Sequence, residues 1–248
     1  MAKQDNILKS PLVRLVIYLV ALTPLIMLRE FAPSSETSYL SIAEEAMCDN
    51  HTWCMYSNGE PYTDNPPLYF WIIMMVERIA GEASTPMALA FFSLIPAFII
   101  VSAFGNWCRE SIKKTSYRGA AEITLMSTAW FLGSAVALSM EMLFTMFVTL
   151  AMVIFWRFYL NKNSLADKWL FGICVLAAML TKGPIGLLLP LAGILVFLAL
   201  DHNFNMARKV WGWRTWVVLI CGCAIWWIST AGEGGPGYLK EMLLQQTI

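Results

Sequence analysis

Apolar segments long enough to cross a lipid bilayer recur along this sequence, and they constrain its fold more than any other feature. A bilayer core of about 30 Å needs about 20 apolar residues of helix, or somewhat fewer when flanking side chains reach the headgroups. The chain of 248 residues is 58% hydrophobic and 14% charged, whereas a soluble domain is about 25% charged. The sequence therefore predicts an all-α polytopic membrane protein.

The predicted topology has seven transmembrane helices. Two of them are short, and the alternative for this pair is one long tilted helix over residues 169–200. Lys182-Gly183-Pro184 interrupts that stretch, and the residue before a proline is pushed out of helical geometry, so a hairpin with a break at Lys182 is favoured. The predicted spans cover residues 12–28, 87–107, 119–138, 142–160, 169–181, 185–200 and 215–231.

Residues 29–86 are predicted to form a loop on the outer face with two interfacial helices. Residues 67–80 would reach about 21 Å as a helix, which is too short to cross the bilayer comfortably, and they include two charged residues. The aromatic residues 69–71 suit the headgroup boundary. The other helix is expected to start near Ser35, where a serine-rich cap precedes apolar residues at helical spacing.

The distribution of charge supports this topology. Cytoplasmic loops carry an excess of Lys and Arg, and with a cytoplasmic N-terminus the predicted inside segments hold 13 of the 17 basic residues. The outer segment, residues 29–86, holds two basic residues and nine acidic ones. Basic loops would lie outside if residues 67–80 crossed the membrane or if residues 169–200 crossed only once. The predicted location is the inner (plasma) membrane, with the active face toward the periplasm.

The overall charge excludes two classes of function. The 17 Lys and Arg residues balance the 17 Asp and Glu residues, so the chain is not a polybasic nucleic-acid binder. Its two histidines leave almost nothing for a His-rich metal site. Any chemistry must use carboxylates, lysines or the backbone.

Two of the six cysteines, Cys48 and Cys54, lie in the predicted outer segment. In an oxidising compartment they would pair across five intervening residues. Two free thiols beside the membrane surface are the alternative, with equal weight.

Four polar stretches, far apart in the sequence, reach the same outer face in this topology. Ionisable groups at membrane level are costly, at about 2.5 to 3.5 kcal/mol for a central position even on lenient insertion scales, so their presence favours a function. Each has an ordinary explanation alone: Glu36 as a helix-start acid, Asp64 as a turn former, Lys182 as a lysine reaching the headgroups. Their convergence favours a binding site. The stretches are residues 33–39, 58–68, 139–141 and 181–184.

Carboxylates with one lysine at the boundary between water and lipid suit a substrate with a charged head and a lipid tail. A polyprenyl-phosphate sugar fits, because its phosphate is held by a cation, either a lysine or a divalent metal ion that bridges carboxylates. Glycosyl transfer also needs a carboxylate that takes the acceptor proton. We expect Lys182 to hold the phosphate and Glu36, Asp64 and Glu141 to supply the base and metal ligands, with Glu36 and Asp64 as the catalytic and metal-ligating candidates.

At these stretches the sequence resembles the C-type membrane glycosyltransferases, and among them the aminoarabinose-transferase and protein O-mannosyltransferase-like group that uses undecaprenyl- or dolichyl-phosphate sugars. Residues 35–43 resemble the family's Asp-Glu-x-Arg-Tyr helix, residues 140–143 its Met-Asp-x-Leu hairpin, and residues 235–240 its outer segment after the seventh span. The two specific matches are Gly59-x-Pro61-Tyr62-x-Asp64-Asn65-Pro66-Pro67-Leu68-x-Phe70-Trp71 and Leu180-Thr181-Lys182-Gly183-Pro184-Ile185-Gly186.

The resemblance implies that an acid in the first outer loop is the catalytic base and that the sugar lies between two loop helices and the spans. The implied partners are a polyprenyl-phosphate sugar donor, a lipid or protein acceptor and membrane lipids, with no nucleic acid. Family members are considerably longer, so the chain is expected to be the N-terminal part of a longer architecture. Candidate substrate-binding residues are Lys182, Tyr39, Tyr62, Asn65 and Glu141.

The sequence departs from the family pattern at three positions. Ser35 aligns with the family's catalytic Asp, Ser38 with its Arg, and Asn65 with the Lys before the double proline. A serine is not a base at neutral pH without an activator. Glu36 or Asp64 would have to take the role, or activity would be weakened or lost.

Three hypotheses follow. The first is a glycosyltransferase that moves a sugar from a polyprenyl-phosphate donor to an outer-face acceptor, such as a lipid A-like glycolipid or a protein. The second is a catalytically impaired or truncated remnant that only binds lipid phosphate, motivated by the three departures. The third is a transporter, which rests only on charges at membrane level, and the sequence has no visible inverted repeat to support it.

Overall fold

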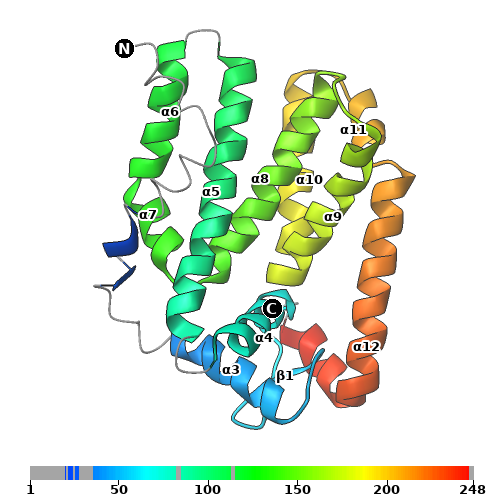
Figure 1. The fold of residues 1–248 in the computed structure, drawn as a ribbon. Coiled ribbons are helices and arrows are strands. Elements are labelled where there is room, and N and C mark those ends of the chain that lie inside the picture. The colour runs from blue at the N-terminus through cyan, green and yellow to red at the C-terminus, as the bar shows by residue number, and fades with distance from the viewer. Residues whose placement is uncertain are drawn as a thin grey trace.

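The computed structural model describes residues 20, 22–24, 26–27, 36–81, 85–112 and 115–245. The predicted span over residues 12–28 lies almost entirely outside the described residues, and Ser35 lies outside them too. The described part of the chain is helical apart from one small hairpin and the connecting segments (Figure 1).

Long helices form a bundle in which α8 and α9 are the central pair. Helix α8 packs against both α5 and α9, and α9 also contacts α10 and α12. In Figure 1 these helices run side by side along the long dimension of the molecule. Their bounds are α5 Thr85–Ser111, α8 Met140–Tyr159, α9 Leu165–Lys182, α10 Ile185–Leu200 and α12 Trp213–Gln245, and the short α11 over Asn205–Val210 precedes α12.

Several of these helices have the length and composition of membrane spans. Among the described residues, three helical segments are long and apolar enough to cross a bilayer: Ala88–Cys108, Met140–Tyr159 and Trp213–Met242. Helix α10 is equally apolar but shorter. Large apolar side chains also point outward, with Val196 60% and Ile228 68% exposed, which is stable in lipid and costly in water.

The segment predicted as one span over residues 119–138 consists of two helices. Helix α6 covers Thr115–Ser127 and α7 covers Ala129–Val136, and the backbone between them is extended at Thr128. The hydroxyls of Ser127 and Thr128 both donate to the carbonyl of Thr124, at 3.1 and 3.0 Å. Such side chains compete with the helical ladder for carbonyl acceptors and bend helices, which accounts for the break.

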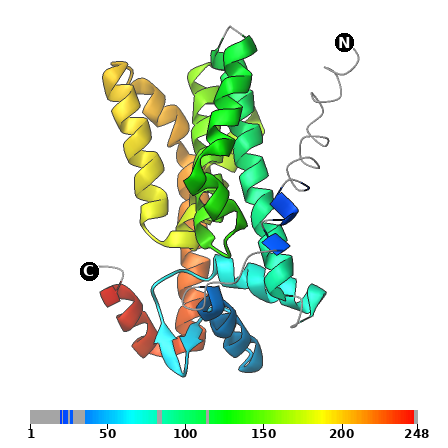
Figure 2. The same cartoon turned by 90° about the vertical axis from the view of Figure 1, so that its left-hand side faces the viewer.

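The outer loop, residues 29–86, carries the two expected helices with a hairpin between them. Helix α3 covers Glu36–Cys48, one residue after the expected start, and α4 covers Leu68–Ala80. Figures 1 and 2 show both helices and the hairpin across one end of the bundle. Strand β1 (Met55–Ser57) pairs antiparallel with β2 (Glu60–Tyr62).

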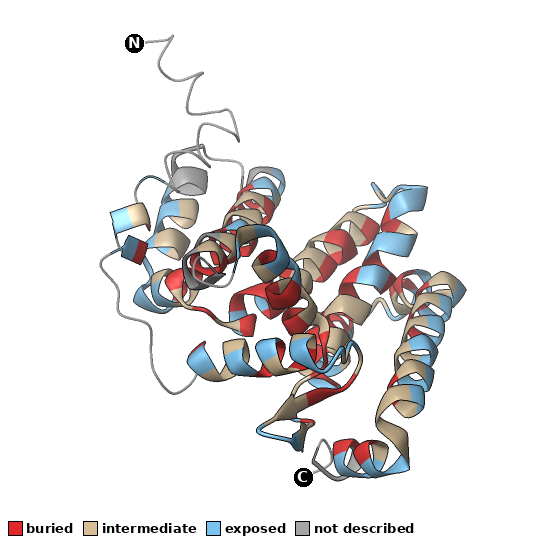
Figure 3. Cartoon of the chain, turned by 60° about the horizontal axis from the view of Figure 1, so that its bottom comes forward, coloured by how far each residue is buried: buried red, intermediate tan, exposed pale blue. Residues whose placement is uncertain are grey.

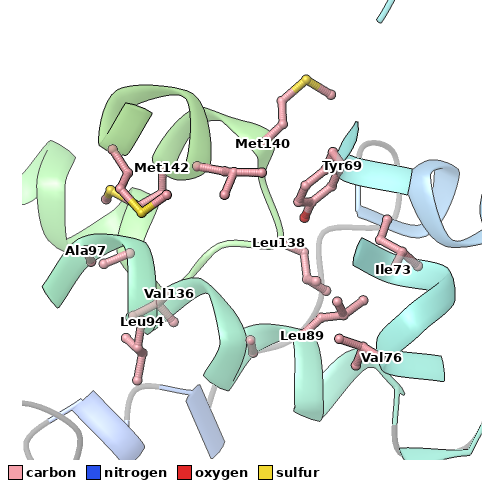
Figure 4. Packing of buried hydrophobic residues seen from close by; sticks show 14 of the residues in the cluster. Tyr69, Ile73, Val76, Leu89, Leu94, Ala97, Val136, Leu138, Met140 and Met142 are labelled. Carbon is pink, nitrogen blue, oxygen red and sulfur yellow. The ribbon is translucent and has the colours of Figure 1, made fainter. Parts of the chain in front are cut away.

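A core of buried apolar side chains fixes the outer loop to the bundle. Figure 4 shows Tyr69 and Ile73 of α4 facing the same cluster as Leu89 and Leu94 of α5. Phe70, Ile73 and Leu94 are fully buried. Figure 3 shows the buried residues along the inner faces of the helices, with exposed residues on the outer faces. Burial of such side chains contributes about 1.5 to 3 kcal/mol each, so the outer loop is held rigidly over the bundle.

The hairpin between α9 and α10 has the break predicted at Lys182. Helix α9 ends at Lys182, and Gly183 follows with a φ of 71°, a conformation that glycine adopts without steric cost. Gly186 then lies against α9, where a Cβ atom would be 2.3 Å from the carbonyl carbon of Ala178. The two glycines therefore let α10 turn back tightly along α9 and fix the position of Lys182.

Candidate functional site

Glu141 and Lys182 meet where α8 begins and α9 ends. Ser139 is the N-cap of α8, and its hydroxyl accepts a hydrogen bond from the N–H of Glu141 at 3.1 Å. Because α8 and α9 run antiparallel side by side, Glu141 in the first turn of one faces Lys182 in the last turn of the other. The Lys182 ammonium forms an ion pair with Oε1 of Glu141 and lies 5.7 Å from the centre of the Phe144 ring. Lys182 and Glu141 remain 28% and 49% exposed.

The outer loop places Tyr39 near Glu141 and Tyr62 near Tyr39. Tyr39 of α3 packs edge-on against Tyr69 and Phe70 of α4, with ring centres 5.7 and 6.1 Å apart. Tyr62 at the end of β2 packs against the same Phe70 at 5.5 Å. Asn65 donates a hydrogen bond from Nδ2 to the Tyr62 hydroxyl at 2.7 Å. Both tyrosine rings therefore pack against Phe70, which is fully buried.

The electrostatics connect the loop with the bundle. Burial raises the pKa of Tyr39, and the carboxylates of Glu141 and Asp64 raise it further. Burial also raises the pKa of Tyr62 to about 12, against the lowering effect of the Asn65 hydrogen bond. Tyr39 and Asp64 add to that rise. Two acids from segments far apart in the sequence therefore act on the one phenol of Tyr39.

Asp64 and Glu36 differ in their surroundings. Asp64 is exposed in the segment that leads from β2 to α4. Glu36 is buried at the start of α3, with 4% of its surface exposed, and its Oε1 accepts a hydrogen bond from the N–H of Leu138 at 2.9 Å. The segment with Leu138 joins α7 to α8, so Glu36 holds α3 against the residues just before Glu141.

The metal centre expected at Glu36 and Asp64 needs further ligands, since divalent cations of the magnesium and calcium type take six or more oxygens. In the residues that the structure describes, no group of three or more His, Cys, Asp or Glu side chains could hold a metal ion. A divalent metal ion at Glu36 and Asp64 therefore stays a prediction.

Glu233 lies in α12 just before the bend at Gly235 and binds the outer loop, which the sequence did not indicate. Its carboxylate accepts hydrogen bonds from the N–H groups of Thr52 and Trp53 at 2.8 and 3.0 Å. His51 Nδ1 lies 3.1 Å from the same carboxylate. The only sequence signal is an acid in a glycine-rich stretch directly after an apolar run, which does not specify backbone partners 180 residues away.

Tyr238 is a second residue of α12 that binds the outer loop and that the sequence did not indicate. Helix α12 bends at Gly235, where φ is 68°, and the segment beyond the bend lies beside the hairpin (Figure 2). The Tyr238 hydroxyl accepts a hydrogen bond from the Met55 N–H at 3.1 Å and donates one to the Tyr62 carbonyl at 2.9 Å. The stretch 235–240 was noted in the sequence only for its resemblance.

Cys48 and Cys54 are both free thiols, so the structure takes the second of the two alternatives. Cys54 is fully buried, and its Sγ lies 3.5 Å from the carbonyl oxygen of Thr230. Burial raises the pKa of Cys54 to about 12, and nearby Glu233 adds to the rise.

The apolar bundle with a polar site under an interfacial layer defines a polytopic membrane protein. The family described as dolichyl-phosphate-mannose-protein mannosyltransferase matches residues 64–228. The chain belongs to this family, within the C-type membrane glycosyltransferases. The match includes Asp64, Asn65, Glu141 and Lys182 and stops before Glu233.

Curated relatives are similar over most of the chain. An uncharacterized protein of Aquifex aeolicus is 26% identical over 196 residues, which cover 78% of this chain and 38% of that protein. An undecaprenyl phosphate-alpha-4-amino-4-deoxy-L-arabinose arabinosyl transferase of Pseudomonas savastanoi pv. phaseolicola is 21% identical over 220 residues, or 86% of this chain and 40% of that protein. The chain thus matches about two fifths of the length of these relatives.

Two solved structures share the fold. ArnT from Cupriavidus metallidurans in the apo state superimposes with a TM-score of 0.76 at 15% sequence identity, covering 92% of this chain and 44% of ArnT. The same protein bound to undecaprenyl phosphate gives a TM-score of 0.76 at 14% identity, over 90% of this chain and 43% of ArnT. With these polytopic neighbours and its apolar helices, the chain is a multi-pass membrane protein.

Proposed function

We propose that the chain takes part in transfer of a sugar from a polyprenyl-phosphate donor to an acceptor at the outer face of the cell's inner membrane. The ion pair between Glu141 and Lys182, beside Tyr39 and Asp64, is the observation that carries this proposal. The arabinosyl transferase named among the relatives and the ArnT structure bound to undecaprenyl phosphate support the class of donor. In the predicted orientation of seven spans with a cytoplasmic N-terminus, this site faces the periplasm.

Lys182 is the proposed ligand of the donor phosphate. Its ammonium is about a quarter exposed and held in place by Glu141 and the Phe144 ring. A hydrogen bond from a charged donor to an anionic acceptor is roughly twice as strong as one between neutral groups. The lysine has three N–H donors, and the ion pair with Glu141 needs one of them. The phosphate can therefore join Lys182 without breaking the ion pair.

Asp64 is the proposed catalytic base, with Glu36 as the second candidate. The exposed Asp64 carboxylate can reach an incoming acceptor, whereas Glu36 is buried and already accepts from Leu138. In the proposed step the acceptor oxygen or nitrogen attacks the anomeric carbon of the sugar. The bond from that carbon to the phosphate oxygen breaks, polyprenyl phosphate leaves, and the acceptor proton passes to the carboxylate. Such base catalysis contributes about 10² to 10⁴ in rate.

Tyr39 and Tyr62 are proposed to donate hydrogen bonds to the donor substrate. A phenol is protonated at neutral pH and can donate, and burial raises the pKa of both tyrosines further. Because the Tyr62 oxygen already accepts from Asn65, its own O–H can turn toward a phosphate or sugar oxygen. Asn65 is thus proposed to position Tyr62.

The acceptor is proposed to be a lipid A-like glycolipid or a protein. The second candidate function is binding of lipid phosphate without transfer, and Asn65 favours it: the family has a lysine there, and in this chain the neutral amide is bonded to Tyr62. Both functions use Lys182, but only transfer needs Asp64.

Purified full-length protein in lipid nanodiscs, given a radiolabelled undecaprenyl-phosphate sugar with either acceptor, separates these two functions. We expect donor binding and transfer in the wild type, loss of transfer with retained binding in Asp64→Asn, and roughly tenfold to hundredfold weaker binding with a matching fall in transfer in Lys182→Gln. Glu44→Gln and Lys240→Gln remove exposed charges from α3 and α12 and should change neither. Binding without transfer in the wild type would favour the binding function, and binding unaffected by Lys182→Gln would overturn the site.

A further inference from the structure

A polar pocket lies at the other end of the bundle from the outer loop. It has a volume of about 300 Å³ and lies where α8 ends and where α9 and α12 begin, beside α11 (Figure 1). This end carries the loops predicted to face the cytoplasm. The polar and aromatic residues that line it are Asn161, Asn163, Lys168, Lys209, Trp213 and Arg214.

Three cations from three helices line this one hollow. Lys168 belongs to α9, Lys209 to α11 and Arg214 to α12. Within the described ranges none of them forms an ion pair. Bringing like charges together without a counter-ion is unfavourable. An anion bound in the pocket would reduce the repulsion among these three cations.

The nearest acid in the sequence cannot neutralise these cations, because it is already engaged. Asp167 is 1% exposed, and its Oδ1 pairs with Arg157 at 2.9 Å. Its Oδ2 accepts hydrogen bonds from the N–H and the hydroxyl of Ser164, in a capping box at the start of α9. Asp167 therefore serves α8 and the helix cap rather than the pocket.

Arg214 is held in place by aromatic rings rather than by an acid. Its guanidinium carbon lies 5.9 Å from the centre of the Trp169 ring and 5.4 Å from that of Trp213. Its Nε is buried without a hydrogen-bond partner in the structure. Trp213 is 65% exposed, and exposed tryptophans are typical of the headgroup layer of a membrane. The pocket therefore combines a cationic centre with side chains suited to lipid headgroups.

We infer that this pocket binds the phosphate of an acidic phospholipid from the leaflet at this end of the bundle. A phosphodiester anion would supply the charge that the three cations lack, and the two asparagine amides can donate to its oxygens. Basic pockets between membrane helices are known to bind anionic headgroups. The first turn of α12 at Trp213 adds the positive end of a helix dipole to the same wall. This inference is independent of the sugar transfer proposed at the opposite end.

Native mass spectrometry of the full chain, released from micelles with either phosphatidylglycerol or phosphatidylcholine, tests the inference. We expect one retained phosphatidylglycerol and no phosphatidylcholine. Each lysine should contribute roughly fivefold to the affinity, so Lys168→Gln with Lys209→Gln should weaken binding roughly thirtyfold. The double change to arginine keeps both charges and should restore binding.

The neighbouring basic residues supply matched controls. Lys162→Gln with Arg208→Gln removes the same charge from exposed positions outside the pocket and should leave retention unchanged. Equal loss in this control would mean a diffuse surface effect and would overturn the site. So would inorganic phosphate that binds with the same dependence on Lys168 and Lys209 while phosphatidylglycerol is not retained, because the ligand would then be a soluble phosphate.

Discussion

Tyr238 donates a hydrogen bond from its hydroxyl to the backbone carbonyl of Tyr62, across 176 residues of sequence, at 2.9 Å. The same hydroxyl accepts from Met55, the residue that pairs with Tyr62 in the hairpin register. The end of α12 therefore fixes the strand that leads to Asp64. Tyr238 lies beyond the residues that match the family, and its contact with Tyr62 positions part of the candidate site.

Tyr238→Phe removes this bridge while it keeps the ring. The Met55 N–H and the Tyr62 carbonyl lose their partner, which we expect to cost about 1 to 3 kcal/mol of stability. Thermal unfolding of the detergent-purified protein measures the effect. Tyr56→Phe is the control, because the Tyr56 ring packs on Tyr238 while its hydroxyl makes no hydrogen bond in the described part of the chain. An equal loss in both variants would contradict a role for the hydroxyl.

Lys182→Gln should weaken binding of undecaprenyl phosphate roughly tenfold to hundredfold, since hydrogen bonds to charged groups are worth about 1.5 to 3 kcal/mol. Equilibrium binding of labelled lipid to nanodiscs measures this change. The exchange of Glu141→Lys with Lys182→Glu keeps an ion pair at the same place. We expect this double variant to fold but not to recover binding. Full recovery would mean that the pair is only structural.

Gly186→Ala should destabilise the hairpin between α9 and α10. The added Cβ would lie 2.3 Å from the carbonyl carbon of Ala178, and overpacking of this kind costs about 1 to 3 kcal/mol. Because the same turn positions Lys182, donor binding should fall as well. In Gly193→Ala on the same helix, the added Cβ would make ordinary contact with Met152, whose Cε is 3.5 Å and Sδ 3.8 Å away. This variant should leave the unfolding temperature and donor binding unchanged.

Tyr62 should make stability depend on alkaline pH. Its pKa is about 12 in the folded protein against 10.0 in the free side chain, so the folded state favours the neutral phenol. This contribution is complete below pH 10.0 and is lost as pH rises toward about 12. The unfolding temperature of the wild type should fall in that window more steeply than that of Tyr62→Phe. Phenolate absorbance should show one late-titrating tyrosine fewer in the variant.

The parts of the fold that the sequence predicts are those with local signals. Gly183 and Pro184 mark the end of α9, and the serine-rich stretch of the sequence predicts the start of α3 within one residue of Glu36. The meeting of Glu141 with Lys182 was predictable because alternation of basic loops places both at the same end of the bundle. None of these three predictions requires knowledge of how distant segments pack.

The parts that the sequence does not predict depend on long-range contacts. Glu233 and Tyr238 bind backbone groups of the outer loop, and backbone groups leave no mark in the sequence. The bend at Gly235 brings them there. The burial of Glu36 against Leu138 likewise depends on how α7 joins α8. The sequence therefore could not show that Glu36 is buried while Asp64, the other candidate base, is exposed.

Labelling of single cysteines with a membrane-impermeant maleimide tests most directly whether Asp64 and Lys182 share one face. In a variant without the six native cysteines, Asp64→Cys and Lys182→Cys should both react in intact cells. Lys209→Cys should react only after permeabilisation, because it lies at the other end of the bundle. Reaction of positions 64 and 182 from opposite sides of the membrane would contradict a shared site.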